Sequence, residues 1–176
     1  EFHAGASTFG LLTTALAVGA LGGALAGTGR RGRPSTAVVI TAGAVFGALE
    51  CVVGFAPTFV TAAVMLAPAG FFMVYFAQAA NQRVQLGTDA EYRGRVMALY
   101  VLVFLGTTPI GAPLIGWFIA HFGPRSGLWL GGSVSLVAAL VTAVVRLRKV
   151  DGQVRLHLRP RPHLHVIEPA RVSSGV

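Results

Sequence analysis

The side chains that could do chemistry are few, and they lie within or beside long apolar runs. Glu50 is an acidic residue set among apolar neighbours, between Leu49 and Cys51. If that run crosses a membrane, its carboxyl group is costly to place there and is a functional candidate by default. Glu50 is therefore the candidate for proton coupling. Its place near the predicted outer end of its helix also allows the simpler interpretation that it reaches water.

Two further groups of polar side chains recur at helical spacing inside apolar sequence. The first group is Tyr75, Gln78, Gln82 and Gln85, with Asn81 beside it. The second group is Tyr100, Phe104, Thr107 and Gly111. Amide, phenol and hydroxyl groups in lipid must face protein or water, so each stripe either hydrogen-bonds a neighbouring helix or contacts a small molecule. Core packing is the expected role of Phe104.

Catalytic and metal-binding patterns are not found in the sequence. It has no Gly-x-Ser-x-Gly elbow, no phosphate loop with its lysine and no His-Glu-x-x-His. His157, His163 and His165 have no carboxylate or cysteine beside them, and their spacing in a tail is a weak metal signal. The sequence therefore predicts no enzyme activity, no metal site and no cofactor.

The elements that must hold these residues are membrane-spanning helices. Hydrophobic residues make up 54% of the 176 and charged residues only 11%, against about 25% in soluble domains. A run from Val96 to Trp117 has no charged residue, and a bilayer core needs roughly 20 apolar residues. The sequence predicts an all-α polytopic membrane protein with five spans, at about 5–27, 36–55, 58–80, 96–120 and 126–145.

Rows of small residues mark the faces along which these spans should pack. Such rows let two helices approach closely. They are Gly19, Gly23 and Gly27; Gly43, Gly47 and Gly54; and Gly127 through Ala143. Pro68 predicts a kink in the third span. Thr88 and Glu91 have capping-box spacing, which predicts that the fourth helix starts near Asp89.

The basic residues, which give a net charge of +8, alternate between the two ends of the spans. Arg30, Arg31 and Arg33 should share one side with Arg83, Arg93, Arg95 and the tail, and Arg125 lies on the other. Positive residues stay on the cytoplasmic side, so the tail is predicted inside and the N-terminus outside. Residues 148–176 are predicted to form a basic, disordered cytoplasmic tail. Clusters of this kind do not form a nucleic-acid face.

One stretch carries a family resemblance. Tyr92-Arg-Gly-Arg-Val-Met-Ala-Leu-Tyr100, followed by Gly106-Thr-Thr-Pro-Ile-Gly-Ala-Pro-Leu-Ile-Gly116, resembles the major facilitator superfamily. The match looks closest to bacterial exporters of the enterobactin-exporter and macrolide-efflux kind. The resemblance implies a secondary active transporter in the cell's inner membrane. This chain would supply helices eight to twelve of its twelve. Its small-molecule substrate would bind between this part and an N-terminal repeat that is missing.

The resemblance also assigns roles to residues. The third span would be the tenth helix, which lines the central cavity, so the implied substrate-path residues are Tyr75, Gln78, Asn81, Tyr100 and Thr107. The loop arginines would serve the cytoplasmic gate: Arg30, Arg31, Arg33, Arg93 and Arg95. The glycine-proline signature would be Gly106, Pro109, Gly111, Pro113 and Gly116. The ninth helix lies at the bundle periphery, which counts against Glu50. The family's usual acidic residue before the loop arginines is replaced by Gly27-Thr28-Gly29.

Other interpretations stay open. The chain could be a non-transporting five-span subunit or an inactive truncated carrier, and a membrane enzyme is a distant further alternative. The chain begins at Glu1 rather than methionine, so it is expected to be part of something larger. As a fragment, its glycine rows at Gly19–Gly27 and Gly127–Ala143 would lack some of their partners.

Overall fold

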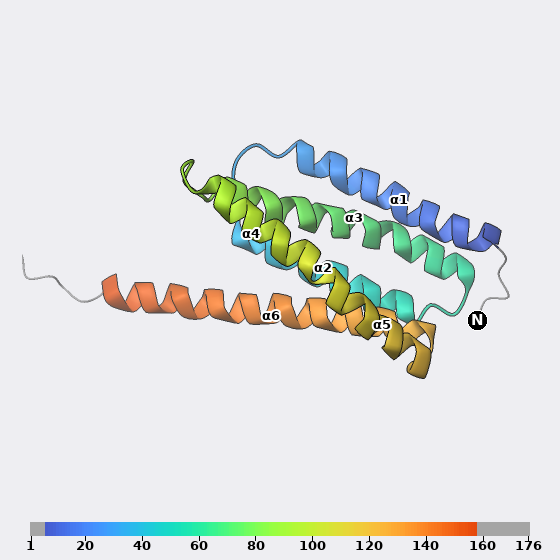
Figure 1. Cartoon of the computed structure of the whole chain (residues 1–176). Helices are drawn as coiled ribbons and strands as arrows, with labels where there is room; N and C mark the ends of the chain where they lie inside the picture. Colours follow the sequence, from blue (N-terminus) through green and yellow to red (C-terminus); the bar gives the residue numbers. More distant parts are fainter. Residues whose placement is uncertain (1–5, 158–176) are drawn as a thin grey trace, which may run out of the picture. The chain divides into compact units, whose positions relative to one another are not determined.

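The structure is a computed structural model that describes residues 6–157, with side chains from residue 7 to residue 148 (Figure 1). Most of the described residues are helical, and the described part of the chain contains no strand. The helices are α1 (Ala6–Thr28), α2 (Thr36–Gly54), α3 (Phe59–Gln85), α4 (Arg93–Gly106), α5 (Thr108–Phe122) and α6 (Pro124–His157). Contacts divide the chain into one unit that ends at Val144 and a second that starts at Val145. All packing described below lies within the first unit.

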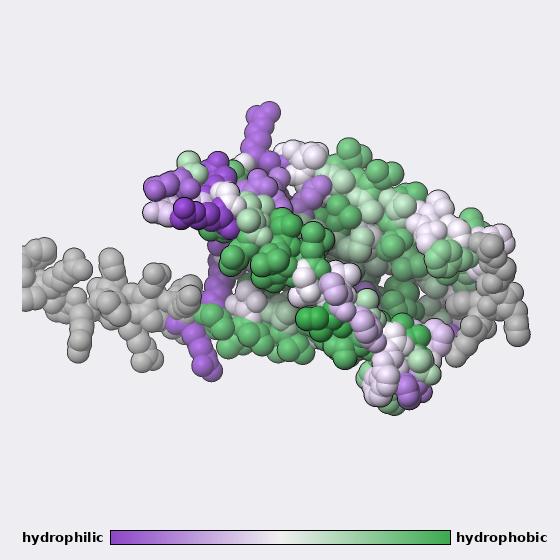
Figure 2. All heavy atoms as spheres, viewed as in Figure 1, coloured by the Kyte–Doolittle hydropathy of each residue, from purple (hydrophilic) through white to green (hydrophobic). Residues whose placement is uncertain are grey.

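Within the described residues, five segments are long and apolar enough to cross a membrane. They are Ser7–Thr28, Thr36–Gly54, Phe59–Gln85, Arg93–Phe122 and Pro124–Arg148. Figure 2 shows apolar residues covering the sides of the helices, whereas hydrophilic residues gather where α3 ends and α4 begins. Exposed apolar sides with polar ends suit a lipid environment. The predicted all-α, five-span fold is confirmed.

Helix α3 is the centre of the packing, because α1, α2 and α4 all contact it. The glycine row of α1 lies directly on the α3 backbone. A methyl group at Gly19 or Gly23 would collide with the carbonyl group of Ala67 or Phe71, and one at Gly70 would collide with Leu16. We call this contact the α1–α3 seam. Gly19, Gly23 and Gly27 therefore have a partner in α3 of the same chain, and the expectation that these rows lack some of their partners stays a prediction.

The small-residue rows of α2 and α6 meet in the same way. A methyl group at Gly47 would lie 2.8 Å from the carbonyl oxygen of Gly132, and one at Gly54 would strike the indole of Trp129. The α6 row also has partners within the chain, because Gly127 faces Ile119 of α5. Close backbone approach of this kind is how helices associate in lipid, where there is no hydrophobic drive between them.

The helix starts follow local capping chemistry. Ser35 caps α2, because its hydroxyl accepts the N–H of Val38 at 3.3 Å. Thr58 and Thr61 form a reciprocal capping box at the start of α3. The predicted start of the fourth helix near Asp89 is wrong: α4 starts at Arg93. The Thr88 hydroxyl turns back and donates to the Val84 carbonyl at 2.8 Å, so it serves the end of α3 instead.

The fourth membrane segment consists of two helices joined at Thr107. Helix α4 ends at Gly106 and α5 starts at Thr108, with Pro109 in its first turn. Proline has no N–H, so the helical bond to the fourth residue before it cannot form. In α3, by contrast, the helix continues through Pro68. The kink predicted there stays a prediction.

Helix α6 extends into the segment predicted as a tail. Its backbone is helical as far as His157. No proline occurs between Pro124 and Pro160, and the segment from Arg146 to Lys149 consists of good helix formers. His163, His165 and the rest of the predicted tail from residue 158 lie outside the described residues.

Candidate functional site

A hollow of about 580 Å³ opens between α3, α4 and the end of α1. Its lining is Thr28, Ala77, Gln78, Asn81, Gln82, Tyr100, Val101, Phe104 and Leu105. We call it the amide hollow. It brings together Gln78, Asn81 and Tyr100 from the two stripes seen in the sequence. Its lining includes no charged side chain, so it offers hydrogen bonds and apolar contact rather than ionic binding.

Gln78 holds the least satisfied polar atom of this site. Its Oε1 is buried and has no hydrogen-bond partner among the described residues. The carboxamide is pressed against α1 at Gly27, where a methyl group would collide with the oxygen. A buried acceptor without a donor is costly, and native structures usually supply it with a water or a ligand. Gln78 therefore holds a buried acceptor for which the described residues provide no donor.

The neighbours of Gln78 hold the rest of the lining in place. The Oδ1 of Asn81 accepts a hydrogen bond from the Nε2 of Gln85 at 2.7 Å. The rings of Tyr100 and Phe104 stack with centroids 6.1 Å apart, which gives α4 an aromatic wall on this side. These contacts fix one amide and one aromatic surface around the hollow.

Two predicted substrate-path residues lie elsewhere. The ring of Tyr75 stacks on Phe71 at 5.7 Å, and the Arg30 guanidinium carbon lies 4.3 Å from its centroid. A cation over an aromatic face is attracted to it, so Tyr75 anchors the α1–α2 connection. Thr107 is exposed and donates its hydroxyl to the Phe104 carbonyl at 3.0 Å. Neither residue lines the amide hollow.

The predicted gate arginines divide into two sets. Arg30 lies on Tyr75, Arg33 lies against Gly87, and Arg93 reaches the Thr88 carbonyl at 3.5 Å. Arg83 also joins two connections, since its Nη1 donates to the Pro34 carbonyl at 2.7 Å. Arg31 and Arg95 have no such contact among the described residues; both are exposed, as are Arg33 and Arg93. The α1–α2 and α3–α4 connections therefore meet at the same end of the helices.

Glu50 and the glycine-proline signature lie away from the amide hollow. Glu50 faces α6, where a methyl group at Gly131 would lie 3.3 Å from its Oε2. Gly106, Gly111 and Gly116 have no atom of another element within 4 Å of where a methyl group would sit. Pro109 and Pro113 lie on α5, which has no buried residue. The signature residues thus occupy an open helix face.

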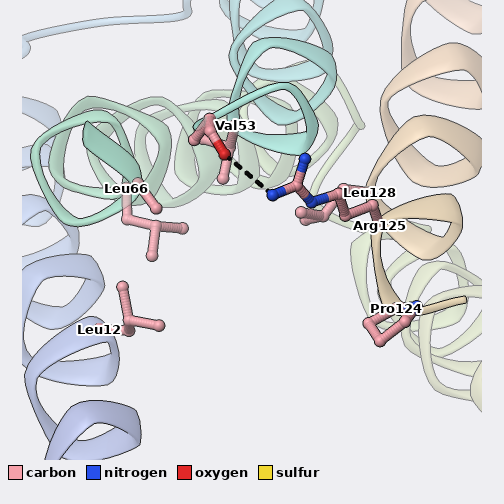
Figure 3. Close-up of a pocket in the computed structure, with 8 residues that line it drawn as sticks. Leu12, Val53, Leu66, Pro124, Arg125 and Leu128 are labelled. Atoms are coloured by element: carbon pink, nitrogen blue, oxygen red, sulfur yellow. Dashed lines mark hydrogen bonds between the residues drawn. The ribbon is translucent and has the colours of Figure 1, made fainter. Parts of the chain in front are cut away.

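A smaller pocket lies at the opposite end, between α1, the end of α2, α3 and the start of α6 (Figure 3). Its volume is about 280 Å³, and Leu12, Val53, Leu66 and Leu128 give it an apolar wall. The Nη2 of Arg125 donates to the Ala56 carbonyl at 3.2 Å, which ties α6 to the α2–α3 turn. The sequence pattern predicted only a topological role for Arg125. Its position beside the Gly123-Pro124 turn was the available sign of a structural role.

A comparison with protein families matches residues 1–173 to the Major Facilitator Superfamily. The chain belongs to that superfamily. Its members are transporters of small molecules in membranes rather than enzymes, which agrees with five membrane-spanning helices and an uncharged hollow. No curated protein and no solved structure matches the chain significantly.

For a major facilitator transporter, this hollow is suited to an uncharged or weakly polar molecule. Small-molecule sites are mostly apolar with a few placed polar groups that fix orientation. Gln78, Asn81 and Tyr100 supply such groups, and Val101, Phe104 and Leu105 supply the apolar wall.

Among the described residues, no three His, Cys, Asp or Glu side chains gather where they could hold a metal ion.

Proposed function

We propose that this chain is part of an efflux permease that works by alternating access, with the amide hollow on the substrate path. The observation that carries the proposal is the meeting of Gln78, Asn81 and Tyr100 around one hollow of about 580 Å³. The side-chain amides of Gln78 and Asn81 and the phenol of Tyr100 supply the polar groups of the lining. The proposed substrate is a small apolar molecule with at least one hydrogen-bond donor.

The amide hollow is lined by α1, α3 and α4, and the outer sides of α4 and α5 are exposed among the described residues. Leu102 and Leu105 of α4 are 68% and 61% exposed, and the signature glycines of α4 and α5 face open space. In carriers of this kind the substrate binds near the midplane, between two repeats. The proposed function therefore includes an N-terminal repeat of the same carrier, which packs on α4 and α5 and closes the hollow.

The proposed orientation follows from the arginines. The two connections that carry Arg30, Arg33, Arg83 and Arg93 meet at one end of the helices. Positive residues favour the cytoplasmic side, which would place these connections and the C-terminal tail inside the cell, in the inner membrane. Arg93 and Arg95, at the start of α4, would then lie at the cytoplasmic gate.

A second candidate is a non-transporting five-span subunit. The α1–α3 seam and the α2–α6 contact support it, because these helices find close partners within the chain. An inactive truncated carrier would have the same contacts. Transport measurements separate both from the permease.

The test is to express residues 1–176 in a bacterial strain that lacks its own efflux pumps, alone and with the N-terminal repeat of the carrier as a separate chain. Accumulation of ethidium and of erythromycin is measured at matched membrane abundance. The permease predicts no efflux from the chain alone and restored efflux from the pair. Efflux by the chain alone would show that its five spans are a complete carrier. No efflux from the pair of either compound, or of a wider dye panel, would favour the subunit or the inactive carrier.

A further inference from the structure

Gly27 differs from the other glycines of the α1 row in what it meets on α3. A methyl group at Gly23 would collide with the carbonyl group of Phe71, which belongs to the α3 backbone. A methyl group at Gly27 would instead collide with the side-chain carboxamide of Gln78. A helical backbone cannot yield to such a contact, whereas the end of a flexible side chain can rotate into another staggered position. Gly27 therefore acts on a side chain that lines the amide hollow.

The carboxamide oxygen of Gln78 fills the space that the missing methyl group leaves. This oxygen is buried, although no described residue donates a hydrogen bond to it. Gln78 lines the amide hollow, and so does Thr28, the residue that follows Gly27. The absence of a side chain at Gly27 thus lets the carboxamide lie against α1, at the wall of the hollow, despite the cost of an unpaired acceptor.

The amide hollow provides the room into which this carboxamide would move if α1 carried a side chain there. On the other side of the contact lies the α1 backbone itself. Asn81, one turn further along α3, is held by its hydrogen bond from Gln85 at 2.7 Å. A displaced Gln78 carboxamide would therefore take up part of the hollow, whose volume is about 580 Å³.

We infer that Gly27 is a positioning residue of the amide hollow. By leaving space for the Gln78 carboxamide against α1, it keeps that side chain at the wall and sets the size of the molecule that the hollow accepts. The link to substrate size rests on the proposed function, because it requires the hollow to lie on the substrate path. The position of Gln78 itself does not, and it can be measured without transport.

The first test follows Gln78 by nuclear magnetic resonance in the 176-residue chain, produced with isotope-labelled glutamine in a neutral detergent. Loss of one side-chain amide signal in Gln78→Ala assigns that signal. In Gly27→Ala, the contacts of these amide protons with the ring protons of Tyr100 and Phe104 should strengthen, because both rings line the hollow. The matched control is Gly29→Ala, which adds a methyl group whose nearest neighbours lie 4.0 Å away and should leave the contacts unchanged. Unchanged contacts in Gly27→Ala would overturn the inference.

Thermal unfolding of the same chain separates positioning from packing. Gly27→Ala should lower the midpoint less than Gly23→Ala does, because the carboxamide yields and the Phe71 backbone does not. In a Gln78→Ala background, Gly27→Ala should cause no further loss, whereas Gly23→Ala should cost as much as before. Equal losses from Gly27→Ala with and without the Gln78 side chain would reduce Gly27 to a seam glycine and overturn the inference. If Gly27→Ala does not fold, recovery of folding by Gln78→Ala decides the same question.

Efflux then connects the position of Gln78 with substrate size. In the carrier assembled with its N-terminal repeat, Gly27→Ala should lower efflux of the larger erythromycin about tenfold and that of ethidium less, as expected for an overpacked site. In the Gln78→Ala background, Gly27→Ala should no longer change the ratio of the two rates. Equal decreases for both compounds would overturn the role in substrate size. A wild-type carrier without efflux would contradict the proposed function, and the resonance and unfolding results would still decide whether Gly27 positions Gln78.

Discussion

Gln78 is the residue at which polarity and burial conflict most clearly. Its carboxamide oxygen is buried without a donor, and Gly27 prevents it from moving towards α1. A side chain kept for packing alone would be better served by leucine, since an unmade hydrogen bond costs about 1–3 kcal/mol. An apolar substitution can distinguish a binding role from a structural one. Loss of a binding role lowers efflux but not stability, whereas loss of a structural role lowers both.

Replacement of Gln78 by leucine should therefore lower efflux without lowering stability. In the carrier assembled with its N-terminal repeat, we expect Gln78→Leu to slow ethidium efflux up to about tenfold, the value of one hydrogen bond. Thermal unfolding in detergent should be unchanged or slightly higher, because the unpaired acceptor is gone. Thr41→Val is the control, since Thr41 is exposed and bonds only to its own helix. A parallel fall in stability and efflux would instead assign Gln78 to packing.

Replacement of Glu50 by glutamine should change transport little. Glu50 faces Gly131 of α6 and does not line the amide hollow. Efflux of ethidium at two external pH values, in cells of equal carrier abundance, measures the effect. An inactive Glu50→Gln carrier together with an active Gln78→Leu carrier would reverse this ranking and assign proton coupling to α2.

Sequence spacing located the polar stripe but not the surroundings of each residue. Gln78 and Asn81 lie three residues apart and line the same hollow, as one helix face requires. Tyr75 belongs to the same spacing, yet its ring is taken by Phe71 and Arg30. The surroundings of Tyr75 depend on where the α1–α2 connection crosses α3. These two segments are far apart in the sequence, so no local pattern predicts the contact between them.

At the scale of the helices, glycine has two different roles in this chain. The α1 glycines meet the α3 backbone, whereas Gly106 and Gly111 meet nothing. The spacing of small residues predicted close contacts but not which helix each row would face. The start of α4 was also missed, because Thr88 can cap in either direction and its hydroxyl bonds back to Val84 at the end of α3.

The two glycine roles predict that a side chain added at each position will change stability by different amounts. Gly23→Val should destabilise the chain by about 1–3 kcal/mol or more, because the α3 backbone cannot yield as a side chain would. Gly106→Val should change the stability of the chain by less than about 0.5 kcal/mol, as for other substitutions that touch nothing. Unfolding in a denaturing detergent titration compares them. Similar losses for both would show that Gly106 is packed within the chain.

At the scale of the whole molecule, the ends of the helices differ in charge and in their contacts. One end carries the arginines of two connections, and the other carries Arg125 bound to the α2–α3 turn. The number of spans and their all-α fold were predictable from apolar run length alone. The break at Thr107 leaves that count unchanged, because α4 and α5 together form one segment from Arg93 to Phe122.

Charge asymmetry predicts the orientation of these ends. In a Cys51→Ser background, a cysteine at Asp89 should resist an impermeant thiol reagent in intact cells, and one at His121 should react. Both positions are exposed. Gly32 and Gly123 are unsuitable, since their φ angles of 94° and 87° disfavour any side chain. Permeabilised cells provide the control, in which both cysteines should react. Labelling of Asp89→Cys in intact cells would invert the topology.

The α1–α3 seam has a mechanical consequence. Gly19 and Gly23 fit against carbonyl groups of α3, and Gly70 fits against α1, so each helix has the other's backbone in its grooves. Sliding α1 along α3 would bring side chains of either helix onto a backbone that leaves them no room. We therefore expect α1 and α3 to move together as one rigid body. In the proposed alternating-access cycle, we therefore expect relative displacement at a looser boundary, such as the open glycine face of α4 and α5.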